Sequence, residues 1–162
     1  MKHKVLWIED GAFAEMKIMS SPIYVSAKYD LVIAIDATEG LKYLRQSDKQ
    51  FETIIVDIRL PPGNELAFLQ LFKEKGESRP AARLGLALLK RVLKKGKNDD
   101  IPPVHREPRR FGVFTVEGYG ELKTDLQELG IEVYHQKGES NDKFKLRDII
   151  EEIRKRNPIP RG

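Results

Sequence analysis

A carboxylate placed directly after a short apolar run is the first candidate for chemistry in this chain. Ile54, Ile55 and Val56 are consecutive, β-branched and apolar, a pattern typical of a strand buried on both faces of a parallel sheet. Asp57 follows, and residues 60–63, Leu-Pro-Pro-Gly, disfavour both a continued strand and an immediate helix. Because ligands of open α/β sheets bind outside the carboxyl ends of the strands, Asp57 is a candidate site residue. The alternative is that Asp57 only caps a turn.

Other polar residues stand at the ends of other apolar runs. Glu9 and Asp10 follow the first run, Thr115 lies near the end of the fourth, and Lys137 follows the fifth. Parallel strands place all their carboxyl ends at one edge of the sheet. We therefore expect these side chains to converge around Asp57.

This set of side chains predicts a cation site suited to phosphoryl transfer. Two carboxylates about 4 Å apart repel each other by roughly 4 kcal/mol at an effective dielectric constant near 20, so the cluster requires a positive charge. Mg²⁺ binds carboxylate oxygens, keeps several waters and meets phosphate oxygens. Lys137 would add an ammonium and Thr115 a hydroxyl donor. A carboxylate can itself be the nucleophile and form an acyl phosphate.

The elements that must position these residues alternate along the chain. The apolar runs predict strands over residues 4–8, 31–35, 54–56, 111–116 and 131–136. Helical spacing predicts helices over about 12–19, 39–47, 64–76, 79–93, 120–129 and 142–156, with a polar loop over 96–110. Strand–helix alternation favours a parallel sheet with right-handed crossovers and helices on both faces.

Local signals mark several ends of these elements. Proline lacks the amide donor, so Pro22 should end or kink the first helix. Asp36-Ala-Thr-Glu39 resembles a capping box, which makes Asp36 an N-cap rather than a catalytic group. Gly130 should close one helix, and Ser140 or Asn141 should cap the last one.

Composition bounds the class of protein. The 162 residues suit one domain with a sizeable core, and 40% hydrophobic with 33% charged residues is typical of a globular chain. The absence of cysteine excludes disulfides, thiol catalysis and zinc–thiolate sites. The apolar runs are too short to span a bilayer, and the amino terminus does not read as a signal peptide. We therefore expect a cytoplasmic protein with no membrane partner.

The net charge of +4 is unevenly distributed. The stretch between Ser78 and Asn98 contains no acid but many basic residues, namely Arg79, Arg83, Lys90, Arg91, Lys94, Lys95 and Lys97. Such a run can bind an acidic partner or nucleic acid, or it can be a solvated helix face, which we favour. No aromatic residue interleaves with it to stack on bases, so a nucleic-acid partner is not expected.

As a set, these motifs resemble the receiver domain of two-component response regulators. Val-Leu-Trp-Ile-Glu9-Asp10 resembles the first strand with its acidic pair, and Ile-Ile-Val-Asp57-Ile-Arg-Leu-Pro resembles the strand with the phosphoacceptor aspartate. Phe-Thr115 resembles the end of the strand that bears the switch threonine. Tyr-His-Gln-Lys137 resembles the final strand with its aromatic switch and lysine.

The resemblance implies a flavodoxin-like, doubly wound fold. The expected sheet has five parallel strands in the order 2-1-3-4-5 with helices on both faces. One receiver-like domain would cover residues 1–156, followed by a tail over 157–162. The likeness covers about 4–59 and 84–156, so residues of about 62–83 have no counterpart and would form a helical insertion. That insertion would lie close to the active rim, where it could cover the site or contact a partner.

The resemblance also implies roles for the acidic residues. Asp57 would accept a phosphoryl group from a histidine kinase or a phosphotransfer protein. Asp10 and Asp57, with the backbone carbonyl of Arg59 and with help from Glu9, would hold Mg²⁺. Lys137 would pair with Asp57 and then with the phosphate.

Two residues would relay the effect of phosphorylation at Asp57 to the protein surface. Thr115 would move inward to bond the phosphate, and Tyr134 would move inward with it and reshape the face made by the last two strands and helices. The alternative for Tyr134 is a plain aromatic at the edge of the core, and for Lys137 a solvated loop lysine. This chain departs from the family pattern at Gly138, where proline is usual, and at Val116, where a small residue is usual.

Three functions follow from these observations. The leading one is a single-domain, Mg²⁺-dependent phosphoacceptor that relays a signal to an unknown downstream protein or through a homodimer. The second is a receiver-like interaction module that does not depend on phosphorylation, for which Gly138, Val116 and the insertion argue. The third is a basic nucleic-acid-binding protein that uses residues 79–97 and whose binding weakens steeply with salt.

Overall fold

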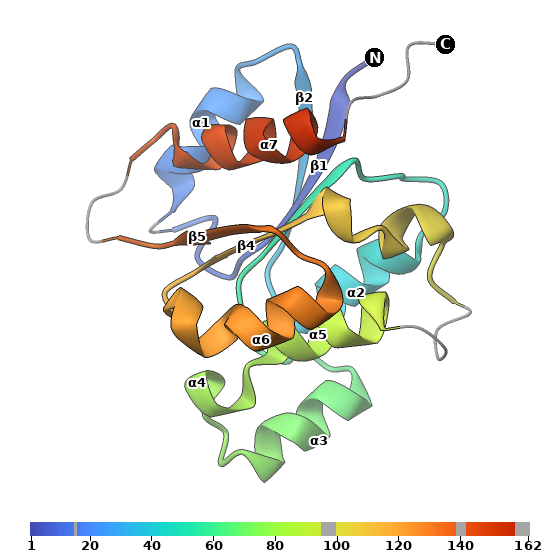
Figure 1. The fold of residues 1–162 in the computed structure, drawn as a ribbon, viewed down its shortest axis with the longest axis vertical. Coiled ribbons are helices and arrows are strands. Elements are labelled where there is room, and N and C mark those ends of the chain that lie inside the picture. Colours follow the sequence, from blue (N-terminus) through green and yellow to red (C-terminus); the bar gives the residue numbers. More distant parts are fainter. Residues whose placement is uncertain (15, 95–99, 139–141, 158–162) are drawn as a thin grey trace.

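The fold is a single parallel sheet with helices on both sides (Figure 1). The structure is a computed structural model, and it describes residues 1–14, 16–94, 100–138 and 142–157. The strands are β1 (His3–Ile8), β2 (Tyr29–Ala34), β3 (Thr53–Val56), β4 (Phe111–Thr115) and β5 (Val133–Gln136). They form a five-stranded sheet in the order β2-β1-β3-β4-β5, and all neighbours are parallel. The predicted flavodoxin-like sheet order is therefore confirmed.

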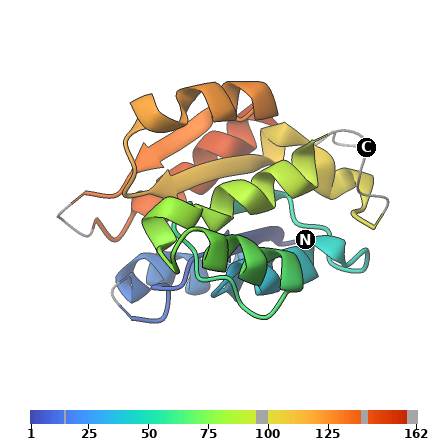
Figure 2. The same cartoon turned by 90° about the horizontal axis from the view of Figure 1, so that it is seen from below.

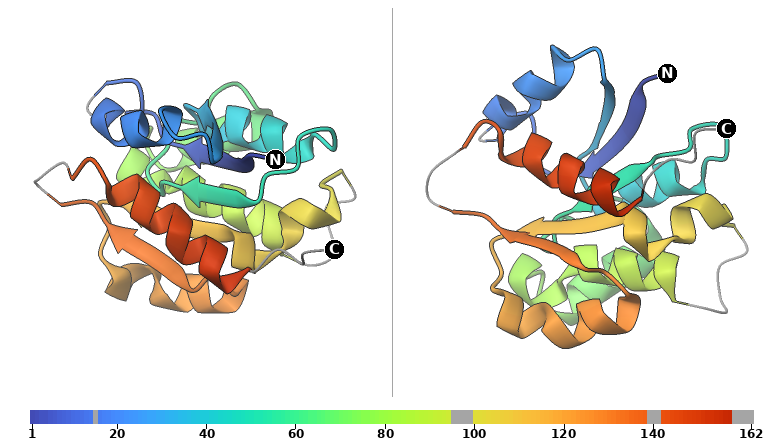
Figure 3. Two further views of the ribbon diagram at one scale, coloured as in Figure 1. Left: turned by 90° about the horizontal axis from the view of Figure 1, so that it is seen from above. Right: turned by 45° about the horizontal axis from the view of Figure 1, so that its top comes forward.

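Two hydrophobic cores lie on the two faces of the sheet, because alternate strand residues point to opposite sides. Val5, Trp7 and Ile55 belong to the core covered by α1 (Lys17–Tyr24) and α7 (Lys145–Arg156). Leu6 and Ile54 belong to the core beneath α2 (Ala37–Arg45), α5 (Leu84–Leu93) and α6 (Tyr119–Leu129). The two views of Figure 3 show this division of the helices between the faces.

Two short helices, α3 (Leu66–Glu74) and α4 (Arg79–Ala82), come between β3 and α5. We call residues 62–83 the α3–α4 segment. Figures 1 and 2 show it outside the layer formed by α5 and α6, so it is an outer addition to that face. Phe68 and Ala82 are its buried apolar anchors.

The register of the sheet explains which strand ends meet. Ile8 pairs with Val56, so the next residues, Glu9 and Asp57, emerge side by side. The amide of Asp57 donates to the Ile8 carbonyl at 3.1 Å, which extends the pairing by one step. On the other side of β3, Thr115 pairs with Gln136, so Lys137 leaves β5 beside the end of β4.

Several element boundaries differ from the sequence-based expectations. The first helix spans Lys17–Tyr24, so Pro22 lies inside it and does not end it. The helix expected over 79–93 is two helices, because Arg83 adopts a left-handed conformation (φ 49°) between α4 and α5. The expected loop over 96–110 includes two 3-10 helices, Pro103–Arg106 and Pro108–Arg110.

Other predicted ends agree with the structure. The side chain of Asp36 accepts a hydrogen bond from the Glu39 amide at 2.7 Å, so the N-cap prediction is confirmed. Gly130 caps α6 in the left-handed conformation, as predicted. The predicted caps Ser140 and Asn141 lie outside the described residues. Within the described ranges, no helix is long and apolar enough to cross a membrane.

Candidate functional site

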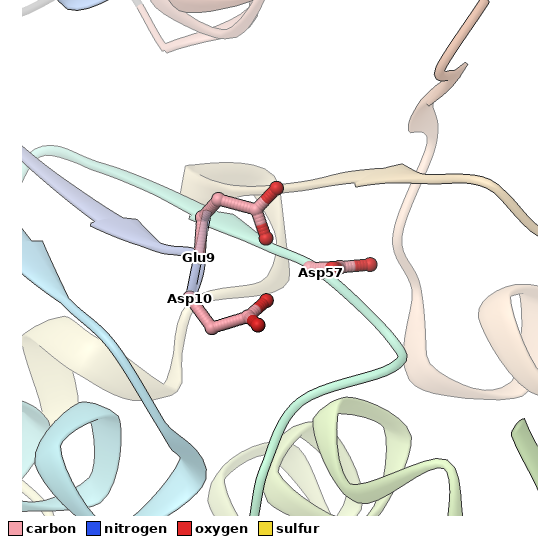
Figure 4. A group of neighbouring side chains, drawn as sticks. All are labelled: Glu9, Asp10 and Asp57. Carbon is pink, nitrogen blue, oxygen red and sulfur yellow. The ribbon is translucent and has the colours of Figure 1, made fainter. Parts of the chain in front are cut away.

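Three carboxylates meet at the carboxyl ends of the two central strands. Glu9 and Asp10 follow β1 and Asp57 follows β3, and one oxygen from each lies within 4.8 Å of the others. Figure 4 shows their side chains extending to the same side of the strand ends. Glu9 and Asp57 are buried, whereas the Asp10 side chain is 30% exposed. The cluster is thus closed on the sheet side and open to solvent at Asp10.

Lys137 supplies an ammonium group to the buried pair. Its Nζ lies 3.0 Å from Asp57 Oδ2 and also donates to Glu9 Oε1. The backbone fixes this position, because the Lys137 amide donates to the Thr115 carbonyl at 2.8 Å. The ammonium also lies over the Phe114 ring, 5.8 Å from its centroid. With a side chain only 13% exposed, Lys137 is part of the cluster and not a solvated loop lysine.

Burial and charge separate the pKa values of the two buried carboxyl groups. Burial, reinforced by the Asp57 charge, raises the pKa of Glu9 to about 8. Burial also acts to raise the pKa of Asp57, but the Lys137 ammonium and hydrogen bonds from Glu9, Lys137 and Thr115 outweigh it and bring that pKa below its ordinary value. Asp57 is therefore held as a carboxylate.

The pKa of Lys137 moves in the direction that keeps it charged. Burial alone lowers the pKa of a lysine, but the charges of Asp57 and Glu9 raise the pKa of Lys137 above its ordinary value. An ammonium and a carboxylate in direct contact are thus the stable protonation states at neutral pH. The pair is thus a buried carboxylate in direct contact with a positive charge.

An arginine that sequence analysis did not assign to the site reaches it from α4. Arg79 Nη2 lies 2.5 Å from Asp10 Oδ2 and 2.9 Å from the Arg59 backbone carbonyl oxygen, which also accepts from Arg79 Nε at 3.2 Å. The sequence placed Arg79 in a basic run whose expected role was a solvated face. No local signal identified its partners, because they are distant in sequence.

A second network surrounds the loop after β4. Glu117 is buried, and its carboxylate accepts from Arg59 Nε at 3.3 Å and from Arg83 at 3.1 and 3.0 Å. The Tyr134 hydroxyl donates to the Glu117 backbone carbonyl, and Thr115 is fully buried two residues earlier. The Glu117 amide also donates to Thr115 Oγ1 at 3.5 Å, so both residues expected to switch bond the backbone of Glu117, a residue that the sequence analysis missed.

The donor set fits a magnesium ion in its chemistry. Three carboxylates and one backbone carbonyl are hard oxygen ligands, and the buried Glu9 Oε2 has no hydrogen-bond partner among the described residues. Glu9, Asp10, Asp57 and the Arg59 carbonyl are the groups that would hold the ion. Asp10 and the carbonyl are, however, also the two partners of Arg79.

The basic run is largely neutralised by acids. Besides Arg79 and Arg83, Lys90 pairs with Asp125 at 3.1 Å and Arg91 pairs with Glu65 at 2.8 Å. Lys95 and Lys97 lie outside the described residues. Lys90 and Arg91 are partly exposed, as expected for a solvated helix face, whereas Arg79 and Arg83 bond residues at the site.

Comparison with known proteins gives a consistent result for the fold. No family model matches the chain, and no curated protein matches it either. Among solved structures it is similar to the phosphorylated cyanobacterial phytochrome response regulator RcpA, with 16% identity and a TM-score of 0.60 over 96% of this chain and 91% of that one.

Two further structures show the same likeness. A receiver domain protein (CheY-like) from Methanospirillum hungatei has 19% identity and a TM-score of 0.57 over 96% of this chain and 97% of that one. The receiver domain of the Francisella response regulator 1452 has 19% identity and a TM-score of 0.59 over 96% and 98%. The chain therefore has the fold of response-regulator receiver domains.

Proposed function

We propose that this chain is a response-regulator receiver domain that accepts a phosphoryl group on Asp57 from a histidine kinase or a phosphotransfer protein. One observation carries the proposal: the Asp57 carboxylate lies 3.0 Å from an ammonium and beside two further carboxylates at the carboxyl edge of the sheet. The Asp57 carboxylate would be the nucleophile, and the Lys137 ammonium beside it would stabilise the negative charge of the incoming phosphoryl group. The receiver-domain fold supports the same assignment.

The proposed reaction is a transfer between two protein side chains. A carboxylate oxygen of Asp57 attacks phosphorus and forms an O–P bond, while the P–N bond to the donor histidine breaks. The electron pair of that bond stays on the imidazole nitrogen, which takes up a proton. Lys137 is placed to bind a phosphoryl oxygen, since its Nζ already touches Asp57. Mg²⁺, when bound by the acidic residues, would neutralise further charge on the phosphoryl oxygens.

The proposed output begins at Thr115 and Tyr134. The Thr115 hydroxyl lowers the pKa of Asp57 by hydrogen bonding, so it is within reach of that carboxylate. Tyr134 bonds the Glu117 carbonyl, and its ring centroid lies 5.2 Å from that of Tyr119 at the start of α6. Movement of Thr115 toward a phosphate would disturb this loop and the adjoining surface of α6 and β5, to which a downstream protein or a second copy would bind.

Intact-mass measurement tests the phosphoacceptor. Incubation with acetyl phosphate and Mg²⁺ should add the mass of one phosphoryl group to the wild type and none to Asp57→Asn, because the amide cannot form the acyl phosphate. Asp36→Asn is the matched control: Asp36 also follows a strand, and asparagine keeps its N-cap. This control should gain the same mass as the wild type. An equal gain in Asp57→Asn would refute the proposal.

A second candidate function is an interaction module that works without phosphorylation. The contacts of Arg79 with Asp10 and with the Arg59 carbonyl favour it, because they give two of the proposed metal ligands a partner already. The mass experiment distinguishes the two candidates. A folded wild type that gains no phosphoryl group, with or without a divalent ion, would support the interaction module.

A further inference from the structure

The α3–α4 segment places a positive charge of the chain itself within the acidic cluster. One terminal nitrogen of Arg79, Nη2, lies 2.5 Å from Asp10 Oδ2 and 2.9 Å from the Arg59 carbonyl oxygen. We propose that the Arg79 guanidinium occupies the divalent-cation position of this site, and that a divalent ion binds Asp10 and the Arg59 carbonyl only when this side chain leaves.

The geometry makes the two cations mutually exclusive. A magnesium ion binds oxygen at about 2.0–2.1 Å, so an ion that bridges these two oxygens must lie between them. The Arg79 nitrogen is within hydrogen-bond distance of both and therefore occupies that space. Its Nε adds a second bond to the same carbonyl at 3.2 Å, so the guanidinium plane is fixed by more than one contact.

The position of Arg79 is set by the fold around it. Arg79 is the first residue of α4, and the Ser78 side chain caps that helix by accepting from the Ala81 amide. Ala82 is buried in the main core, and Arg83 directly after α4 makes a paired contact with buried Glu117. These anchors hold the backbone of α4 beside the site, from where the guanidinium reaches the Asp10 carboxylate and the Arg59 carbonyl.

The same structure shows how the side chain can leave. The Arg79 side chain is 41% exposed and Asp10 is 30% exposed, whereas Glu9 and Asp57 are almost fully buried. The guanidinium is thus at the solvent side of the cluster, and rotation outward moves it into water. Glu9, Asp57 and Lys137 keep their mutual hydrogen bonds when this happens, because no hydrogen bond or ion pair joins any of them to Arg79 among the described residues.

This inference deepens the proposed function, because it rests on the same acidic residues and gives the cation site a built-in competitor. Arg79 would set the divalent-ion concentration at which the site is loaded. It would also act as a positioning residue for Asp10 when no ion is bound.

Direct metal binding tests the inference. Mn²⁺ is the probe, because its free form has an electron paramagnetic resonance signal that binding removes, and Mg²⁺ is then added as the competitor. We expect Arg79→Met to bind Mn²⁺ about tenfold more tightly than the wild type, since a charge-assisted pair with the ligands no longer has to break. Arg79→Lys should fall between the two, because lysine keeps the charge but lacks the fork geometry.

Arg91→Met is the matched control. Arg91 lies on the adjoining α5 and its ion pair uses Glu65, so this variant loses the same charge and one ion pair without touching the cluster. It should bind Mn²⁺ within about twofold of the wild type. The double variant Arg79→Met with Asp10→Asn should not show the increased Mn²⁺ affinity of Arg79→Met. The inference would be overturned if Mn²⁺ affinity rose no more in Arg79→Met than in Arg91→Met, or if the higher affinity of Arg79→Met persisted when Asp10→Asn was added.

A second measurement uses the wild type and so does not depend on how well a variant folds. The Nε–H resonance of Arg79, assigned by its loss in Arg79→Lys, should shift toward the position of solvent-exposed arginines as Mg²⁺ is added and should saturate with the ion. An unchanged resonance at saturating Mg²⁺ would contradict the displacement. If Mn²⁺ binds more tightly to Arg79→Met but acetyl phosphate leaves Asp57 unmodified, the inference stands and the phosphoacceptor proposal fails.

Discussion

Glu9 and Asp57 are carboxyl groups at neighbouring strand ends, but their surroundings give them opposite protonation behaviour. Burial and the Asp57 charge raise the pKa of Glu9 to about 8, whereas contact with Lys137 brings that of Asp57 below its usual value. Both groups accept a hydrogen bond from the same Lys137 ammonium. For Glu9, burial and the Asp57 charge outweigh this contact, whereas for Asp57 the ammonium and the hydrogen bonds outweigh burial. Separation of this kind keeps Asp57 ionised at neutral pH while Glu9 holds a proton.

The raised pKa of Glu9 makes a prediction about stability. The usual value of 4.5 rises to about 8 in the fold, so between these two values the folded state binds a proton that the unfolded state releases. Stability therefore falls as the pH rises through this window. Glu9→Gln removes the titration, and we expect the variant to gain on the order of 4 kcal/mol relative to the wild type as the pH rises from about 5 to 8. Urea unfolding at several pH values, without divalent ions, measures this.

Glu65→Gln is the control for that prediction. The Arg91 hydrogen bond lowers the pKa of Glu65, so its contribution is complete above the usual value of 4.5 and is lost only at more acidic pH. Its stability difference from the wild type should stay constant in the window where that of Glu9→Gln changes. If the unfolding free energies of the wild type and Glu9→Gln changed in parallel with pH, Glu9 would not hold a proton in the folded state over this window.

At the scale of elements, the first turn of α5 lies directly against the end of β3. The Gly85 amide donates to the Ile58 carbonyl at 2.9 Å, and a Cβ added at Gly85 would lie only 1.8 Å from the Asp57 carbonyl oxygen. Glycine is required there by the close approach of two backbones. The helix and the peptide that bears Asp57 are therefore positioned together.

The close approach predicts a stability loss in Gly85→Ala. The added methyl group must displace either α5 or the β3 end, which we expect to cost at least about 1–3 kcal/mol of unfolding free energy. Gly120→Ala is the control, because Gly120 lies in α6 with nothing within 4 Å of its added Cβ. That substitution should be neutral or stabilise by about 0.5–1 kcal/mol through helix propensity. Thermal unfolding measures the stability of both variants. A Gly85→Ala protein as stable as the wild type would contradict the close packing of α5 against the end of β3.

At the scale of the whole molecule, the features predicted from the sequence are those that strand and helix periodicity determines. Consecutive β-branched residues before Asp57 identified a fully buried strand, and alternation with helices implied a parallel sheet whose ends converge. The cap at Asp36 was predicted correctly because a capping box is a local signal. Convergence then follows from parallel pairing and needs no knowledge of distant contacts.

Long-range contacts decide the features that the sequence did not predict. Arg83 breaks the expected helix over 79–93 with a left-handed turn, and its side chain bonds Glu117, which lies far along the chain. Arg79 reaches Asp10 and the Arg59 carbonyl in the same way. A run of basic residues has the same appearance in sequence whether its partners are water or buried carboxylates, so only the fold distinguishes these cases.

Chemical trapping of the phosphorylated residue tests most directly whether Asp57 is the phosphoryl acceptor, as we propose. After incubation with acetyl phosphate and Mg²⁺, borohydride reduces an aspartyl phosphate to homoserine, and trypsin releases residues 50–59, in which Asp57 is the only aspartate. We expect homoserine at position 57 and at no other aspartate of the chain. Unmodified Asp57 in a folded protein, or homoserine at a different position, would contradict it.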